Sequence, residues 1–550
     1  MKRKKALLLL VLALLLSIFL AACAEEPEDT ASPTDDSTEK ETDTESGKST
    51  QGAGEKNSGT GGGDLVIATL SDAVSMDPAG SNDNPSSNVQ ANIFESLTKQ
   101  DQNMEVQPSL AESWEEIDEV TWEFKLREGV TFHDGSEFNA EVVKANIERL
   151  LDPEVASPRV FLYEMISKIE VVDDYTVRFV TEYPFSPLPA HLAHSGGGMV
   201  SLEQIEADYA AMEEGEEPGS VINGNPIGTG FFKFDEWRPG ELLRLVRNDD
   251  YWGEPAKLDS VTFKVVDETL TRVAELETGE AHIADPISPN NIAQIEATDG
   301  IHVSQQGSVS LSYVGFNMEK EPFNDPLVRQ AINMAIDKEQ IINGIYEGVG
   351  TPAIGPLAPD VLGYDPDAPG LEYDPDKARE LLAEAGYENG FSTTLWTNDN
   401  QERMDAATNI QAQLAEFGIE VEIEVVEWGA YLEQTANGEH DMFILGWSTV
   451  TGDADYGLYP LFHSNNVGEP GNRTFTKDPE LDELLDHARQ EGDPETRQQL
   501  YSEIQVLLTD IAPMLYIHHQ DFLLGVSDKV EGLTQSPTQI LQLHEVTITE

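Results

Sequence analysis

The sequence predicts a mixed fold, of the α/β or the α+β class, with more than one domain or lobe. Two patterns and the chain length lead to this prediction. TWEFKL (121–126) has the two-residue alternation of a half-buried strand, whereas NDPLVRQAINMAID (324–337) has helical spacing. The chain has 550 residues, of which 39% are hydrophobic. Such a chain can bury a large core and is too long for a single domain.

The expected elements follow each other along the chain. In TWEFKL, the side chains of Trp122, Phe124 and Leu126 fall on one face and polar side chains on the other. Residues 133–135, His-Asp-Gly, have the composition of a turn, and a helix is expected after them at NAEVVKANIERLLD (139–152). Further strand patterns are DLVIATL (64–70), YTVRFV (175–180) and VTFKVV (261–266).

Two later stretches carry helix signals. In YDPDKARELLAEAGY (373–387), Asp374 suits the N-cap, Pro375 the first helical position and Gly386 the C′ position. In 324–337, the apolar residues at helical spacing are Val328, Ala331, Ile332, Ala335 and Ile336.

Cys23 is the only cysteine, and its position indicates a membrane anchor. Residues 1–22 have a basic start, a short apolar run and small residues at the end, which predicts a secretory signal rather than a spanning helix. LAAC (20–23) resembles the bacterial lipoprotein box, in which the cysteine is diacylated. More than one acyl chain is needed for stable anchoring, so this resemblance implies attachment to the outer face of the cell membrane. The alternative is an ordinary cleavage site with a chance cysteine.

Acidic residues dominate the chain. The sequence has 102 Asp and Glu against 33 Lys and Arg, and its formal net charge is -69. This balance excludes a nucleic-acid surface, which needs basic residues. Because the acids run through every segment, we expect adaptation to high salt, where screening removes their repulsion. The alternative is an acidic patch for cationic ligands. Residues 23–63 have almost no large apolar side chain, so we expect a disordered acidic tether.

Several stretches together resemble one family, the bacterial extracellular solute-binding proteins of family 5. This family includes the peptide-, dipeptide-, nickel- and glutathione-binding components of ABC importers. The resemblance covers roughly 64–550, and HDMFILGWSTVTGDADYGLYPLFHS (440–464) is most similar to the glutathione-binding members. The other stretches are LAESWEEIDEVTWEFKLREGVTFHDGSEFNAEVV (110–143), NPIGTGFFKFDEWRPGELLRLVRNDDYWGEPAKLDSVTFKVV (225–266), YVGFNMEKEPFNDPLVRQAINMAIDKEQIINGIYEGVGTPAIGPLAP (313–359) and YDPDKARELLAEAGYENGF (373–391).

The resemblance implies an α/β, two-lobed clamp of the periplasmic-binding-protein type II, with an extra domain in lobe one. Chain crossings between the lobes would act as a hinge, and the ligand-closed form would meet the ABC permease subunits. We expect a monomer without cofactors. The expected divisions are lobe one at 64–107, its extra domain at 108–225, lobe one again at 226–310, lobe two at 311–518 and lobe one at 519–550.

A cleft that holds a short peptide needs hydrogen-bond partners, an anion for the amine and an Arg for the carboxylate, and aromatic rings add contact area. The stretch GWSTVTGDADY (446–456) supplies such residue types. The alternatives are core packing for aromatic candidates, loop or surface charge for acids and a surface ion pair for the Arg. The candidates are Trp447 for stacking, Ser448 and Thr449 for hydrogen bonds, Asp453 and Asp455 as anions, Arg403 as the cation, and Tyr313 and Asn317 at the crossing into lobe two.

One position departs from the family pattern. Peptide binders of the family place an amine-binding Asp three residues after the Gly-Trp pair, and this chain has Val450 there. The amine partner must then be Asp453, Asp455 or another residue, or the ligand is not a simple α-peptide. Glutathione, with its γ-linked Glu, satisfies the second option.

Other function classes find less support. The G-x-S-x-G and HEXXH motifs are both absent, so we expect no enzyme. His518-His519 has no third metal ligand at a recognisable spacing, and MLYIHHQDF (514–522) is better interpreted as a strand. Within the family, a nickel or metal-chelate receptor and an oligosaccharide receptor remain as alternatives to a peptide or glutathione receptor.

Overall fold

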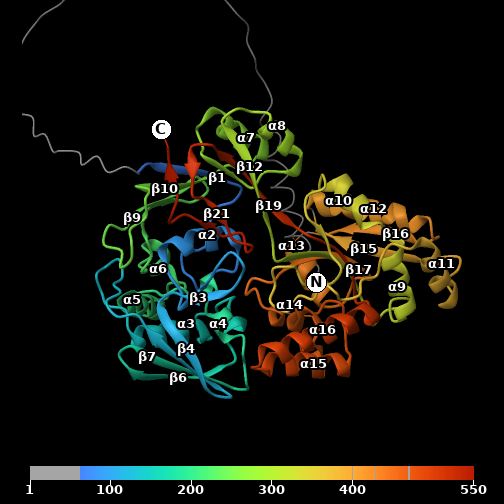
Figure 1. Ribbon diagram of the computed structural model, residues 1–550, viewed down its shortest axis with the longest axis horizontal. Coiled ribbons are helices and arrows are strands. Elements are labelled where there is room, and N and C mark those ends of the chain that lie inside the picture. Colours follow the sequence, from blue (N-terminus) through green and yellow to red (C-terminus); the bar gives the residue numbers. More distant parts are fainter. Residues whose placement is uncertain (1–61, 399, 427, 469–470, 550) are drawn as a thin grey trace, which may run out of the picture. The chain divides into compact units, whose positions relative to one another are not determined.

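The computed structural model describes residues 62–398, 400–426, 428–468 and 471–549 (Figure 1). Its fold is mixed α/β, which confirms the predicted class, and most strands belong to three sheets. The predicted signal segment 1–22, Cys23 and nearly all of the predicted tether 23–63 lie outside the described residues. No helix within the described ranges has both the length and the apolar composition to cross a membrane.

The largest sheet has seven strands in the order β12-β19-β11-β1-β10-β9-β8. β1 pairs in parallel with β10 and β11, so it lies inside the sheet with Leu65 and Ile67 fully buried. The strands predicted at 64–70 and 261–266 are thereby confirmed. The strands are β1 (Asp64–Thr69), β8 (Phe232–Arg238), β9 (Leu242–Arg247), β10 (Ser260–Val265), β11 (Ile283–Asp285), β12 (Ile301–Gly307) and β19 (Asp521–Ser527).

A second sheet has six strands in the order β14-β18-β13-β17-β15-β16. One face of its centre is apolar, because Val314, Phe316 and Ile444 are buried there against apolar side chains of helices. The stretch 514–522 forms β18 and the start of β19, as its strand interpretation predicts. The strands are β13 (Ser310–Phe316), β14 (Thr351–Pro352), β15 (Ser392–Thr397), β16 (Glu420–Val425), β17 (Met442–Ser448) and β18 (Met514–His519).

The third sheet is antiparallel, with four strands in the order β4-β5-β7-β6. TWEFKL forms β5, and Phe124 and Leu126 are buried as predicted. Glu123, expected on the polar face, is also buried, because its carboxylate pairs with Arg178 on the neighbouring strand at 2.7 Å. The strands are β4 (Ala111–Asp118), β5 (Thr121–Leu126), β6 (Ile166–Asp173) and β7 (Thr176–Thr181).

The predicted helices are present, and the ends predicted for the helix at 373–387 are confirmed. Asn139 caps α3 (Ala140–Leu151), and Asp374 caps α11 (Pro375–Glu384), where it accepts from the Lys377 amide at 2.9 Å. Gly386 follows α11 with φ +86°, a conformation that glycine adopts without strain. The predicted apolar positions of α9 (Pro326–Ala335) and its C-cap are buried.

Further helices surround the sheets. They are α2 (Asn84–Ile93), α4 (Leu188–His191), α5 (Leu202–Glu213), α6 (Ser220–Gly224), α7 (Thr269–Thr278), α8 (Ile292–Glu296), α10 (Lys338–Ile345), α12 (Gln401–Ala415), α13 (Trp428–Ala436), α14 (Ala454–Phe462), α15 (Pro479–Gln490) and α16 (Pro494–Ile511). Short strand pairs are β2 (Thr98–Gln100) with β3 (Val106–Pro108), β20 (Val530–Glu531) with β23 (Thr547–Ile548), and β21 (Thr534–Gln535) with β22 (Leu541–Gln542).

Two neighbouring chain segments connect the seven-stranded and the six-stranded sheets directly, one in each direction. β12 leads into β13, and β18 leads into β19 after a single residue, Gln520. The two crossings are hydrogen-bonded to each other, since the Ser308 amide donates to the Gln520 carbonyl oxygen at 3.1 Å. The two large sheets are therefore joined by a short two-stranded ribbon.

Candidate functional site

A cavity of about 650 Å³ lies between the two large sheets. Strands β11 and β19 of the seven-stranded sheet contribute residues to it, as do β13, β17 and β18 of the six-stranded sheet. We call it the Arg403 cavity. Of the predicted site residues, the structure brings Arg403, Trp447 and Ser448 together here.

Arg403 lies in the first turn of α12, where local capping holds the backbone. Asn400 caps this helix and accepts from the Arg403 amide at 2.9 Å. The Arg403 side chain donates from Nη1 to Asn398 Oδ1 at 3.0 Å. Its guanidinium lies beside Gly446 of β17, because a Cβ on that glycine would be 3.6 Å from Nη2. An Arg held at a cavity wall is suited to two parallel hydrogen bonds with a carboxylate.

Trp447 and Ser448 end strand β17 and are half-buried. The Trp447 Nε1–H donates to the Tyr456 carbonyl oxygen at 2.9 Å, and the two rings are 5.3 Å apart. This indole N–H is therefore used inside the protein, and the ring is the part of Trp447 that a ligand could contact. Ser448 lies opposite Ser310 of β13, which also lines the cavity.

Tyr313, Asn317 and Thr449 do not line the Arg403 cavity. Tyr313 is fully buried, with its ring edge-on to Phe443 at 5.7 Å. Asn317 is buried too, and its side-chain amide donates to the carbonyl oxygens of Gly438 and His440 at 3.0 and 3.1 Å. In this structure Tyr313 packs in the core, Asn317 hydrogen-bonds to a neighbouring chain segment, and Thr449 is buried.

Asp453 caps α14 and is paired inside the protein. Its carboxylate accepts from the Asp455 amide at 2.9 Å. Both of its oxygens also accept from the Arg497 guanidinium, each at 2.6 Å, and both side chains are buried. This two-bond pair already satisfies the charge of Asp453.

Asp455 has the same kind of partner. Arg489 donates to its two oxygens at 3.0 and 2.8 Å, and the Asp455 side chain is 3% exposed. Burial alone would raise the pKa of Asp455, but the adjacent guanidinium outweighs burial and lowers it. Asp455 is thus an ionised carboxylate held by a cation of the same chain.

Arg489 also touches the part of the chain that follows the four-stranded sheet. Its guanidinium carbon is 5.3 Å from the Phe185 ring centroid and 3.5 Å from that of Tyr459 on α14. The Ser186 amide donates to the Arg489 carbonyl oxygen at 3.3 Å. Arg489 therefore joins α14 and α15 to the segment after β7.

The sequence prediction missed Asp285, which lines the Arg403 cavity at the end of β11. It also lines a second cavity of about 330 Å³, here called the Asp72 cavity. Asp285 is 7% exposed, and burial raises the pKa of its carboxyl to about 6. The available signal was an acid at the end of a short apolar strand, directly before Pro286.

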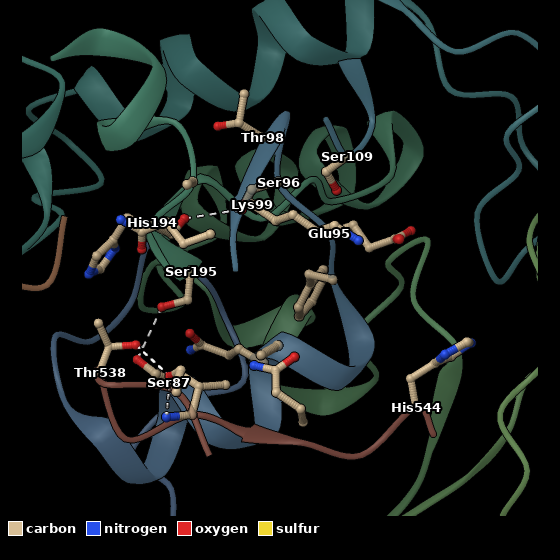
Figure 2. A pocket seen from close by; sticks show the side chains of 18 of the residues that line it. Ser87, Glu95, Ser96, Thr98, Lys99, Ser109, His194, Ser195, Thr538 and His544 are labelled. Atoms are coloured by element: carbon tan, nitrogen blue, oxygen red, sulfur yellow. Dashed lines mark hydrogen bonds between the residues drawn. The ribbon is translucent and has the colours of Figure 1, made fainter. Parts of the chain in front are cut away.

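A third cavity, of about 630 Å³, is lined by Lys99 and Val450 and is called the Lys99 cavity. Figure 2 shows the hydroxyl side chains of Ser87 and Ser195 together on one wall, where they are hydrogen-bonded at 3.2 Å. Buried Arg159 donates to Ser87 and Ser195 at 2.9 and 3.1 Å, and it has no carboxylate within ion-pair distance among the described residues. The wall therefore carries hydroxyl groups backed by a cation.

The described residues contain no group of three His, Cys, Asp or Glu side chains placed to bind a metal ion. His518 lines the Arg403 cavity, and burial lowers its pKa to about 4, so the ring is neutral at pH 7. Burial lowers the pKa of His519 to about 4 as well.

Comparison with known proteins identifies the family. Residues 105–469 match the model of bacterial extracellular solute-binding proteins, family 5. The glutathione-binding protein GsiB of Pectobacterium atrosepticum is 35% identical over 497 residues, which cover 88% of this chain and 94% of that protein. GsiB of Escherichia coli strain K12 is 35% identical over 462 residues, covering 82% and 88%.

Solved structures share the fold. The periplasmic binding protein DppA of Helicobacter pylori, in complex with the peptide STSA, has a TM-score of 0.76 and 34% identity. The match covers 89% of this chain and 99% of that one. HbpA2 of Haemophilus parasuis has a TM-score of 0.79 and 30% identity over 88% of this chain and all of its own. GsiB and DppA are binding proteins, which confirms the prediction of a non-enzymatic protein with the two-lobed fold.

Proposed function

Because this chain belongs to family 5 of the bacterial extracellular solute-binding proteins, we propose that it captures peptides or glutathione for an ABC importer. The observation that carries the proposal is the 35% identity with a glutathione-binding protein along nearly the whole of both chains. The peptide bound to the DppA relative supports the same ligand class. Permease subunits in the membrane would be the partners.

The Arg403 cavity is the proposed binding site. Its volume of about 650 Å³ lies within the range of ~300–1,000 Å³ that is usual for small-molecule sites. We assign the carboxylate of the ligand to Arg403, stacking contact to the ring of Trp447 and a hydrogen bond to Ser448. Asp453 and Asp455 are less suited to the ligand amine, because each is already paired with a guanidinium.

The mechanism would be capture between two lobes that then close. Three features support this part of the proposal: the cavity lies between the two large sheets, a short ribbon joins these sheets, and Arg489 contacts the segment after β7. We keep the expected divisions, with lobe two at 311–518, its flanking segments in lobe one and an extra domain at 108–225. The anchor would be a lipid on Cys23.

The test is calorimetry with the purified full chain in mild detergent and high salt. The titrants are reduced glutathione, a panel of dipeptides and tripeptides, and nickel with and without histidine. We expect micromolar or tighter binding of glutathione or peptides. Binding of nickel-histidine alone would contradict the peptide proposal in favour of a metal-chelate receptor. Binding of oligosaccharides alone, in a parallel titration, would contradict it in favour of a sugar receptor.

A further inference from the structure

Asp285 has a rigid position at the wall of the Arg403 cavity. It is the last residue of β11, which lies between β1 and β19 inside the seven-stranded sheet. Asp285 is opposite Thr69 in the parallel pairing with β1, and its carbonyl oxygen accepts from the Leu70 amide at 3.0 Å. The side chain therefore projects from a fixed backbone rather than from a loop.

The Oδ1 atom of Asp285 is buried and has no hydrogen-bond partner among the described residues. Arg272 of α7 is the charged group whose field acts on it. Arg272 is not its partner, because all five donors of that guanidinium are used elsewhere. They bond to the carbonyl oxygens of Val266, Asp267 and Pro286 and to the Thr269 hydroxyl. A buried carboxylate without a partner is costly and calls for an explanation.

Asp285 faces space that a ligand can occupy. It lines both the Arg403 cavity and the Asp72 cavity, and the uncharged side chains of Asn84 and Gln539 line both as well. The carboxylate is thus next to two cavities in a protein whose proposed ligands carry a protonated amine.

The other acids at these cavities are paired or exposed. Asp72 accepts from the Trp237 indole and from the Gly240 amide. Asp521 accepts from the Gln305 side chain. Glu402, beside Arg403 in the same cavity, is an exposed residue, although partial desolvation of its carboxyl raises its pKa. Asp285 alone combines burial, a place on the cavity wall and a carboxylate left without a bond among the described residues.

We propose that Asp285 pairs with a protonated amine of the ligand, while Arg403 binds its carboxylate. This inference rests on the proposed function and specifies the ligand as a zwitterion with a free ammonium group. An ammonium gains more from a carboxylate that is already desolvated and fixed than from one that must first lose its water. The assignment also supplies an amine partner for a chain that has Val450 after its Gly-Trp pair.

The experiment compares ligands that have a free amine with the same ligands after the amine has been acetylated. Calorimetry with the full chain uses reduced glutathione and trialanine, each with and without an N-acetyl group. We expect acetylation and the D285N substitution each to weaken binding about 10- to 100-fold, the range for a hydrogen bond to a charged group. In D285N, acetylation should have little further effect. D299N removes an exposed acid that lines none of these cavities; it is the matched control and should keep the affinity of the unchanged chain within about twofold.

Three results would overturn the assignment. One is equal affinity of the unchanged chain for free and acetylated probes, which needs no variant and so does not depend on folding. The second is an unchanged affinity of folded D285N. The third is a loss of affinity in E402Q, at another acid of the Arg403 cavity, in place of D285N. If the unchanged chain binds neither glutathione nor peptides, the proposed function fails and the role of Asp285 fails with it. If it binds them and the substitution has no effect, only the role of Asp285 fails.

Discussion

Replacing Arg489 with Met would leave Asp455 buried without its cation. The two side chains are 12% and 3% exposed, so water can replace little of the lost interaction. Removing one partner of a buried ion pair costs about 3–5 kcal/mol of the free energy of unfolding. We expect R489M to lose an amount in this range. Because the pair is buried, the loss should persist in high salt, unlike the loss of a surface pair.

The assay is urea unfolding followed by circular dichroism, at low and at high salt, with the single variant D455N and the double variant R489M/D455N as comparisons. Removing both charges leaves no buried ion, so the double variant should recover much of the stability that R489M loses. The reasoning would be refuted if R489M stayed within about 1 kcal/mol of the unchanged chain. It would also be refuted if R489M/D455N lost as much as the two single variants together.

Three further predictions concern other charged or reactive groups. Arg403→Ala should weaken binding of a peptide with a free carboxylate about tenfold or more and leave a C-amidated peptide unaffected, as measured by calorimetry. Cys23→Ala should release the chain from the membrane into the medium, and an unchanged membrane fraction in cell fractionation would contradict the anchor. Asp285→Asn should stabilise the ligand-free protein above pH 6. Burial raises the pKa of Asp285 from 3.8 to about 6, so the ionised carboxylate lowers the free energy of unfolding by up to about 3 kcal/mol above pH 6. This gain should disappear below about pH 4, and a pH-independent difference in melting temperature would contradict the cause.

Local patterns in the sequence predicted local structure well. The cap at Asp374, the first-turn Pro375 and the stop at Gly386 depend on neighbours within one helix, and the structure has all three. The alternation in TWEFKL correctly predicted β5. It did not predict the burial of Glu123, because that depends on Arg178, which comes from another strand.

The candidate site depends on partners far apart in the sequence, and this limited the prediction. Asp453 and Asp455 have the composition of ligand-binding acids, but their partners Arg497 and Arg489 lie on α16 and α15. A single sequence does not show this pairing. Asp285 was missed for the converse reason, since its lack of a partner becomes visible only after β11 is placed between β1 and β19.

The ribbon between the large sheets also has a consequence for genetic exchange. His519 Nδ1 is 2.9 Å from the Ser310 carbonyl oxygen, so the chain leaves and re-enters the seven-stranded sheet region at one place. The intervening segment 310–519 thus has adjacent ends, so an exchange of this segment would need only two neighbouring junctions. A chimera that takes this segment from a relative would inherit the donor's Arg403 and Trp447 positions and keep the recipient's Asp285.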